Sequence, residues 1–244
     1  MTVFGRVKRI HMIGIGGSGM SAIAEILLGM GYHVAGSDIA ETAVTARLAD
    51  LGADIHIGHR YDNVGDADVL VYSSAILGPN PEKDCAKDKG IPIIGRAEML
   101  AELSRMKHGI DIAGTHGKST TTSLVGVLLR QAGLDPTIIV GGKAANLGGP
   151  AQLGTGDYLV LEADEFDRTF LSLRPTVAVV TTLEQEHLEC YDGMEDLTSS
   201  FVQFLNSVPF YGASIICLDE RNLEELLPRL KRRVITYGLS TQSD

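Results

Sequence analysis

Short runs of β-branched residues alternate with helical apolar patterns along the chain, and this alternation most constrains the fold. Val7–Ile13 is a strand candidate, and Met20, Ile23 and Leu27 then recur at helical spacing. The same order continues to a last predicted strand at Val234–Tyr237. Alternation of this kind is typical of helices packed on a mostly parallel sheet. We therefore expect an α/β fold.

The alternation restarts near the middle of the chain. Lys107-His108-Gly109 is typical of a linker, and Ile110–Ala113 and Lys118–Gln131 begin a second strand–helix series. A chain of 244 residues has room for one or two domains of about 150 residues each. The other predicted strands are His33–Ala35, Ala53–Ile57, Asp68–Tyr72, Ile91–Ile94, Thr137–Val140, Tyr158–Glu162, Thr176–Leu183 and Ser214–Leu218, and the other predicted helices are Val44–Leu51, Glu82–Lys89, Arg96–Arg105, Glu195–Ser207 and Leu223–Leu230.

The first glycine-rich loop reads Ile-Gly-Ile-Gly-Gly-Ser-Gly-Met over residues 13–20, between a predicted strand and a predicted helix. Gly14, Gly16 and Gly19 match G-x-G-x-x-G, in which glycine permits a tight turn, a close pyrophosphate and close helix packing. Asp38 follows near the end of the second strand, where a ribose-binding acid or a turn residue is typical. A dinucleotide such as NAD(P), a nucleotide sugar and a purely structural turn all fit this loop.

The second glycine-rich loop reads Ala-Gly-Thr-His-Gly-Lys-Ser-Thr-Thr-Thr over residues 113–122, again between a strand and a helix. Gly117-Lys118-Ser119 is the core of a phosphate-binding loop, in which the lysine reaches the β/γ-phosphates and the hydroxyl can bind Mg²⁺. The longer G-x-x-x-x-G-K-[ST] pattern is not met, because residue 112 is isoleucine. A plain dehydrogenase explains the first loop but leaves the second without a role.

Carboxylates follow two later predicted strands. Glu162, Asp164 and Glu165 come after one of them, at a strand end that lies beside the phosphate loop in such folds. They are candidates to bind or support Mg²⁺, although a solvated acidic loop has the same composition. His187 lies among further carboxylates after the strand Thr176–Leu183, which favours a metal or phosphate ligand.

Composition excludes several classes of protein. With 21 Lys and Arg against 31 Asp and Glu, the formal net charge is −10, whereas a protein that coats nucleic acid needs clustered cations. The apolar runs are far shorter than the roughly 20 residues of a membrane span, and the first residues do not resemble a signal peptide. Three widely spaced cysteines fit no disulfide or zinc pattern. We expect a cytoplasmic protein with reduced thiols that binds neither nucleic acid nor membrane.

Seven segments together resemble the Mur ligase family. They are the loop at 13–20, Gly-Ser-Asp at 36–38, Ser-Ser-Ala-Ile at 73–76, Arg-Ala-Glu-Met-Leu at 96–100, the loop at 113–122, Glu-Ala-Asp-Glu at 162–165 and Phe-Val-Gln-Phe-Leu-Asn-Ser-Val-Pro-Phe-Tyr-Gly at 201–212. The resemblance implies a Rossmann-like parallel-sheet domain over residues 1–107 that binds a UDP-sugar. An incomplete P-loop ATPase-type α/β domain over residues 108–244 would bind ATP, and from the resemblance we expect the family's third, amino-acid-binding domain to be missing from this sequence.

The resemblance implies an ATP-dependent amide ligase of peptidoglycan synthesis. ATP would phosphorylate the lactyl carboxylate of UDP-N-acetylmuramate, and the amine of L-alanine would attack the acyl phosphate. We expect little or no ligation from a chain of this extent alone. A recycling ligase of the same family, which adds a tripeptide to this UDP-sugar, is the nearest alternative. An NAD(P)-binding oxidoreductase or sensor and a non-catalytic nucleotide-dependent switch are alternatives from other classes.

The resemblance also implies roles for individual residues. Lys118 would neutralise the transferring phosphoryl group, Ser119 and Glu162 would hold one Mg²⁺ or Mn²⁺, and His187 would help to hold a second. The residues expected to bind ATP are Gly114, Thr115, His116, Gly117, Lys118, Ser119 and Thr120. Those expected to bind the UDP-sugar are Gly14, Gly16, Gly17, Ser18, Gly19, Met20, Ser37, Asp38, Ser73 and Ser74.

The chain departs from the family pattern at a few positions. Ser119 replaces a more frequent threonine and keeps its hydroxyl. Thr182 and Glu186 stand where the family usually has asparagine and aspartate, and Pro150 stands where it usually has asparagine.

Overall fold

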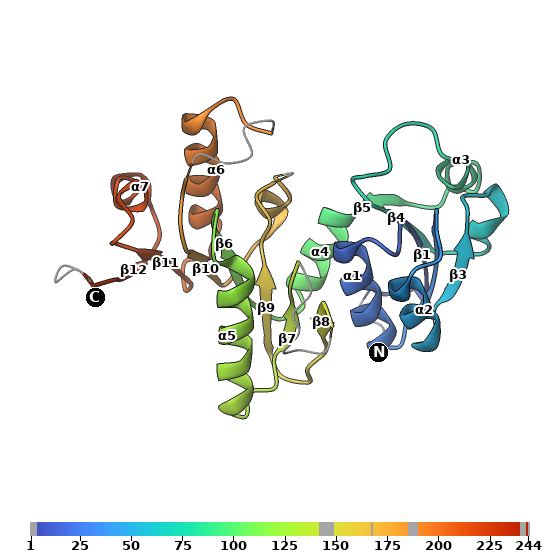
Figure 1. Cartoon of the computed structure of the whole chain (residues 1–244), viewed down its shortest axis with the longest axis horizontal. Helices are drawn as coiled ribbons and strands as arrows, with labels where there is room; N and C mark the ends of the chain where they lie inside the picture. Colours follow the sequence, from blue (N-terminus) through green and yellow to red (C-terminus); the bar gives the residue numbers. More distant parts are fainter. Residues whose placement is uncertain (1–3, 142–148, 167, 185–189, 240–242, 244) are drawn as a thin grey trace. The chain divides into compact units, whose positions relative to one another are not determined.

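A computed structural model describes residues 4–141, 149–166, 168–184, 190–239 and 243 of the chain (Figure 1). Contacts within the molecule define two compact units, one of residues 1–100 with 147–153 and the other of residues 101–146 with 154–244. Two parallel sheets are present, so the α/β fold that the alternation predicts is confirmed. Among the described helices, none is long and apolar enough to cross a membrane.

The first sheet has five strands in the order β3-β2-β1-β4-β5. The strands are β1 (Arg9–Ile13), β2 (His33–Asp38), β3 (Asp54–Ile57), β4 (Val69–Tyr72) and β5 (Ile93–Gly95), and the helices are α1 (Ser18–Gly29), α2 (Ala43–Asp50), α3 (Pro81–Asp88) and α4 (Arg96–Ser104), with a 3₁₀ turn η1 at Tyr61–Val64. β1 pairs in parallel with β2 on one side and β4 on the other. The strand order therefore reverses at β1, and sheets of this kind bind ligands beyond the carboxyl ends of the strands at such a point.

The second sheet has seven strands in the order β12-β11-β10-β6-β9-β7-β8. The strands are β6 (His108–Ala113), β7 (Thr137–Ile139), β8 (Ala151–Gln152), β9 (Tyr158–Glu162), β10 (Val177–Val180), β11 (Ala213–Cys217) and β12 (Val234–Tyr237), and the helices are α5 (Lys118–Gln131), α6 (Met194–Asn206) and α7 (Arg221–Glu224), with 3₁₀ turns η3 (Thr169–Ser172) and η4 (Leu227–Arg229). β6 pairs in parallel with β10 and with β9, so the segments that leave these three strands meet at one edge.

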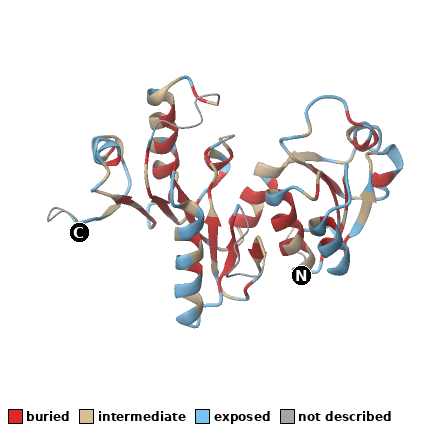
Figure 2. Cartoon of the chain, viewed as in Figure 1, coloured by how far each residue is buried: buried red, intermediate tan, exposed pale blue. Residues whose placement is uncertain are grey.

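Buried side chains concentrate along the central strands and on the inner faces of the helices (Figure 2). Four of the five residues of β1 are buried, as expected of a parallel strand that has helices on both faces of its sheet. The large apolar residues of α1 that face inward include Met20, Ile23 and Leu27, each at most 1% exposed. These helices and strands fix the loops between them in place.

A few boundaries differ from those predicted. His108 and Gly109 belong to β6 and do not form a linker. The helix predicted over Leu223–Leu230 is replaced by the short α7 and by η4, because Pro228 has no N–H to continue a helix. β10 ends at Val180, earlier than predicted, and the next two threonines bond to a neighbouring loop. The two-residue strand β8 has too little sequence pattern to be predicted.

Candidate phosphate-binding sites

The first glycine loop is held in shape by the end of β2. The Ser37 carbonyl accepts hydrogen bonds from the N–H groups of Gly14 (2.8 Å) and Ile15 (3.1 Å). The Asp38 carboxylate accepts the N–H of Gly16 at 2.8 Å. A β-carbon at Gly16 would lie only 2.9 Å from an Asp38 oxygen, so any side chain here would displace the carboxylate that accepts the Gly16 N–H.

The end of β4 lies beside the same loop, at the point where the strand order reverses. The N–H of Ser73 donates to the Ile13 carbonyl at 3.1 Å, and a β-carbon at Gly14 would lie 3.1 Å from that of Ser73. Ser74 is exposed, as are Gly17 and Ser18 at the start of α1. The structure therefore brings most of the predicted UDP-sugar residues together at one edge of the first sheet.

Two predicted residues of this set face the interior. Met20 is 1% exposed, so its side chain belongs to the core and does not face a ligand at the loop surface. Ser37 is 0% exposed, and its hydroxyl donates to Glu82 at 2.6 Å. Ser37 thus supports the loop through its carbonyl, while its hydroxyl faces the interior and not the loop surface.

Arg96 lies beside the first glycine loop, although it is not among the residues predicted to bind the UDP-sugar. It begins α4, and its Nη1 lies 2.5 Å from the point where a β-carbon of Gly19 would be. A guanidinium beside a glycine loop suits a diphosphate, because its planar donors match phosphate oxygens. Its place in the segment Arg-Ala-Glu-Met-Leu is the signal in the sequence that could have identified it.

The second glycine loop depends on glycine at two positions. Gly114 has φ +133°, and a β-carbon there would overlap the Thr181 hydroxyl. Gly117 has φ +82° and precedes α5 without any side-chain cap, so the first N–H groups of α5 have no partner from a capping side chain. Positive φ is strained for residues with a β-carbon. Ser119 and Thr120, in the first turn of α5, are exposed.

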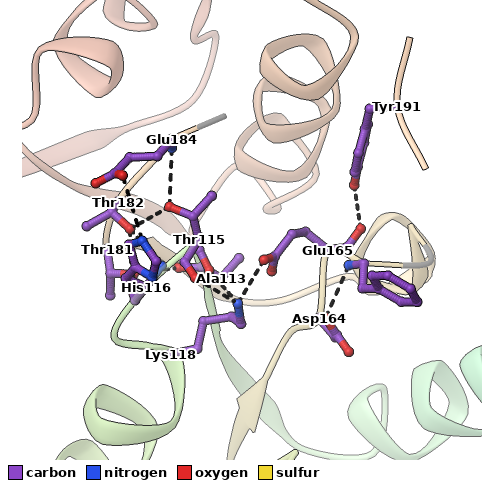
Figure 3. A network of polar contacts seen from close by, with 12 residues as sticks. Ala113, Thr115, His116, Lys118, Asp164, Glu165, Thr181, Thr182, Glu184 and Tyr191 are labelled. Carbon is purple, nitrogen blue, oxygen red and sulfur yellow. Dashed lines mark hydrogen bonds and ion pairs between the residues drawn. The ribbon is translucent and has the colours of Figure 1, made fainter. Parts of the chain in front are cut away.

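Two threonines after β10 hold this loop in shape (Figure 3). The Thr182 hydroxyl accepts the N–H of His116 at 2.8 Å and lies 2.8 Å from the Thr115 hydroxyl. The Thr181 hydroxyl donates to the His116 carbonyl. Thr182 is one of the departures from the family pattern, and here its hydroxyl supplies an acceptor that the loop backbone uses.

The Lys118 ammonium already has protein partners in this structure. Its Nζ lies 2.8 Å from Glu165 Oε1 and donates to the Gly114 carbonyl at 2.7 Å. Glu165 is 0% exposed. Burial raises the pKa of Glu165, and the hydrogen bond and charge of Lys118 offset this rise only in part. Tyr191 donates its phenolic hydrogen to the Glu165 carbonyl (Figure 3).

The other carboxylates after β9 are also engaged with backbone. Glu162, half-buried at the strand end, accepts the N–H of Gly141 at 2.9 Å, and Asp164 accepts the N–H of Phe166 at 3.1 Å. Within the described ranges, no three His, Cys, Asp or Glu side chains are grouped closely enough to hold a metal. Mg²⁺ commonly uses only one or two carboxylates and takes its other ligands from phosphate and water. His187 and Glu186 lie outside the described residues.

Two parallel α/β sheets, each with a glycine loop at the carboxyl edge of its strands, define the class of fold in which phosphate groups are commonly bound at the start of a helix. Residues 9–108 match the Mur ligase family, catalytic domain, and residues 112–244 match the Mur ligase middle domain. The chain belongs to the Mur ligase family, as its seven segments predict.

The chain is similar to several proteins with a common name. It is 54% identical, over 99% of its length, to a UDP-N-acetylmuramate–L-alanine ligase from Geobacter sulfurreducens and 57% identical, over 98%, to one from Sorangium cellulosum. It covers 53% and 51% of those two proteins, so the chain spans about half the length of the curated relatives it matches.

Solved structures show the same arrangement of strands and helices. A UDP-N-acetylmuramate–alanine ligase from Thermotoga maritima matches with TM-score 0.82 and 30% identity, over 96% of this chain and 53% of that one. A UDP-N-acetylmuramate:L-alanyl-gamma-D-glutamyl-meso-diaminopimelate ligase from Neisseria meningitides matches with TM-score 0.85 and 28% identity, over 94% of this chain and 78% of that one.

Proposed function

We propose that this chain forms part of an ATP-dependent ligase that joins L-alanine to the lactyl carboxylate of UDP-N-acetylmuramate. The observation that carries the proposal is the 54% identity, over 99% of the chain, to a relative that bears this name. The recycling ligase is a weaker candidate, because two solved structures that bear that kind of name are 28% and 26% identical to the chain, against 54% for the curated L-alanine ligase.

We assign the UDP-sugar to residues 1–107 and ATP to residues 108–244. The UDP diphosphate would lie against the first glycine loop, where the start of α1 offers N–H groups and the positive end of the helix dipole. Arg96 would add a cation beside Gly19. Ser73 and Ser74, at the end of β4, would supply hydroxyls.

The triphosphate of ATP would lie on the second loop. Lys118 would exchange its contact with Glu165 for a phosphate oxygen and so neutralise charge on the transferring phosphoryl group. Ser119 and Glu162 supply the hard oxygen donors that Mg²⁺ or Mn²⁺ prefers, and a bound ion there would offset phosphate charge. A role for His187 at a second ion rests on the family resemblance alone.

The proposed reaction has two steps. A lactyl carboxylate oxygen attacks the γ-phosphorus and ADP leaves, which gives an acyl phosphate. The amine of L-alanine then attacks the acyl carbon and inorganic phosphate leaves, so that the amide forms and the amine loses its proton. The part of this chain is to bind and orient the UDP-sugar and ATP and to stabilise phosphoryl charge. Since ATP and UDP-sugars are cytoplasmic compounds and all three cysteines are free, we assign the enzyme to the cytoplasm.

Calorimetric titration of the chain with UDP-N-acetylmuramate at low salt tests the proposal. We expect saturable binding, and a second, separate titration with ATP should also show binding. A folded sample that gives no heat with millimolar UDP-sugar would overturn the assignment. Fluorescence on addition of NADH is the matched control, because an NAD(P)-binding protein should respond to it and this ligase should not.

A further inference from the structure

A fully buried carboxylate lies beneath the first glycine loop. Glu82, in the first turn of α3, is 0% exposed. Its Oε2 accepts the Ser37 hydroxyl at 2.6 Å and lies 3.2 Å from His11 Nε2. Its Oε1 accepts the Asn63 amide at 2.6 Å and the Arg60 N–H at 3.2 Å. Four donors from three separate segments, β1, β2 and the η1 turn, thus converge on one carboxylate.

The charge on Glu82 is maintained by these donors. Burial acts to raise the pKa of Glu82, but hydrogen bonds from His11, Ser37 and Asn63 together outweigh it and hold the pKa at about 2. The carboxylate is therefore ionised at neutral pH, and each neighbour must donate to it. A buried charge that is fully hydrogen-bonded makes its surroundings rigid, since any movement leaves a donor without a partner.

The order of the hydrogen bonds excludes a nucleophilic serine. The Ser37 hydroxyl donates to Glu82, so its oxygen accepts from His59 Nδ1, which lies 2.9 Å away. In a hydrolase triad the imidazole takes the proton of the serine and the carboxylate orients the imidazole. Here the serine lies between the acid and the histidine, and the imidazole is the donor. This arrangement positions Ser37 and does not activate it.

Ser37 transmits that position to the glycine loop. Its carbonyl accepts the N–H groups of Gly14 (2.8 Å) and Ile15 (3.1 Å), while Asp38, the next residue, accepts that of Gly16 (2.8 Å). Three consecutive N–H groups of the loop are thus anchored on two residues at the end of β2. The side chain of the first of these residues is held by Glu82.

We propose that Glu82 is a positioning residue for the first glycine loop, acting through Ser37 without touching the ligand. The inference rests on the proposed function only for the identity of that ligand, a nucleoside diphosphate sugar. Loss of the carboxylate should release the Ser37 hydroxyl and make the loop more mobile. It should therefore weaken the binding of the sugar nucleotide. Binding of ATP on the second loop should not change.

The test compares Glu82→Gln with Asp84→Asn, a change of an acid on the same helix whose side chain is 58% exposed. A glutamine cannot accept on both ends, so its NH₂ must face one pair of the four donors. In the ligand-free chain we expect the amides of Gly14, Ile15 and Gly16 to exchange hydrogen at least about tenfold faster in Glu82→Gln. The amides of β6 and β9 should keep their wild-type rates, and Asp84→Asn should match wild type throughout.

Binding supplies the second readout. We expect the Kd for UDP-N-acetylmuramate to rise at least about tenfold in Glu82→Gln, or about 1.4 kcal/mol, with the Kd for ATP within twofold of wild type. Glu82→Asp, which keeps the charge, should recover part of the loss. Unchanged loop exchange and unchanged affinity in a folded Glu82→Gln protein would overturn the inference.

Failure of the proposed function and failure of the inference about Glu82 give different results. If wild type binds no UDP-sugar, the proposed function fails, but the exchange rates of the loop amides still decide the role of Glu82. If Glu82→Gln does not fold, Ser37→Ala replaces it, because this variant removes the hydroxyl link and keeps the carbonyl. Faster loop exchange in Ser37→Ala supports the inference, and wild-type exchange overturns it.

Discussion

Lys118 Nζ lies 2.8 Å from Glu165 Oε1, in a pair whose carboxylate is completely buried and whose ammonium is 14% exposed. The ammonium therefore has a protein anion beside it where the proposed function requires a phosphate oxygen. Glu165 and an incoming phosphate compete for the same hydrogen-bond donor. Removal of Glu165 should therefore favour the phosphate, and removal of Lys118 should deprive both anions of this donor.

Replacement of Glu165 by glutamine should strengthen the binding of ATP in the absence of metal. The change removes a negative charge next to the phosphate site, and we expect the Kd to fall about fivefold, or ~1 kcal/mol. Titration with ATP in the presence of a chelator measures this effect. Glu195→Gln, on an 80% exposed side chain of α6, is the control and should leave the Kd unchanged. Weaker binding in Glu165→Gln would show that the pair assists the site.

Replacement of Lys118 by alanine should abolish most of the ligase activity of the full-length protein. A charge that acts on the transferring phosphoryl group is expected to contribute at least about a hundredfold to kcat. Steady-state rates with saturating substrates measure it, and Lys87→Ala, on an exposed side chain of α3, serves as control. A fall of less than tenfold, about 1.4 kcal/mol, would contradict the role of Lys118.

Two glycine substitutions separate backbone strain from steric overlap. Gly114→Ala combines φ +133° with an overlap on Thr181, whereas Gly133→Ala has φ +78° and open space around the new carbon. We expect Gly133→Ala to lower the free energy of unfolding by about 1–2 kcal/mol and to leave ATP binding intact. Gly114→Ala should lower it further and remove ATP binding. Denaturant unfolding and calorimetry measure the two effects, and equal behaviour of the variants would refute the steric argument.

The hydroxyl of Thr182 should matter for ATP and not for the fold. Thr182→Val keeps the shape but leaves the N–H of His116 without its acceptor, and we expect ATP affinity to fall about threefold to tenfold. Thr182→Asn introduces the residue that is more usual in the family and supplies a carbonyl acceptor, so its affinity should stay near that of wild type. Wild-type ATP affinity in Thr182→Val would show that the hydroxyl has no special role.

The contribution of Glu82 to stability should depend on pH in a defined direction. Its folded pKa of about 2 lies below the ordinary value of 4.5, so the stabilisation is present above pH 4.5 and is lost as the pH falls towards 2. The full difference corresponds to roughly 3 kcal/mol. The gap in unfolding free energy between wild type and Glu82→Gln should therefore narrow over this range. A gap that is constant with pH would contradict an ionised, stabilising Glu82.

The sequence predicts the elements next to the glycine loops best. α5 occupies the predicted range Lys118–Gln131, because a strand, a glycine turn and the left-handed Gly133 mark its two ends. β10 is shorter than its apolar run, since Thr181 and Thr182 leave the strand to bond with the loop. Strand length depends here on a tertiary contact that periodicity cannot register.

The supporting residues of the sites are the part that sequence reasoning misses. Glu82 belongs to a charged segment that is typical of a solvated helix face, yet it is 0% exposed. Its partners, His11, Ser37 and Asn63, are spread over the first 63 residues, and only the fold brings them together. Ser37 is identified as part of a motif, but its direction into the interior follows from the pleat of β2 and from Glu82.

Thr182 and its neighbour fix the second glycine loop through bonds between protein groups alone. A loop that already has its shape gives up little conformational freedom when a ligand arrives. Capture of a nucleotide then requires no folding of the loop, only the release of Lys118 from Glu165. Association should accordingly follow the pace of diffusion and charge steering, while the lifetime of the complex is set by how readily the lysine returns to its carboxylate.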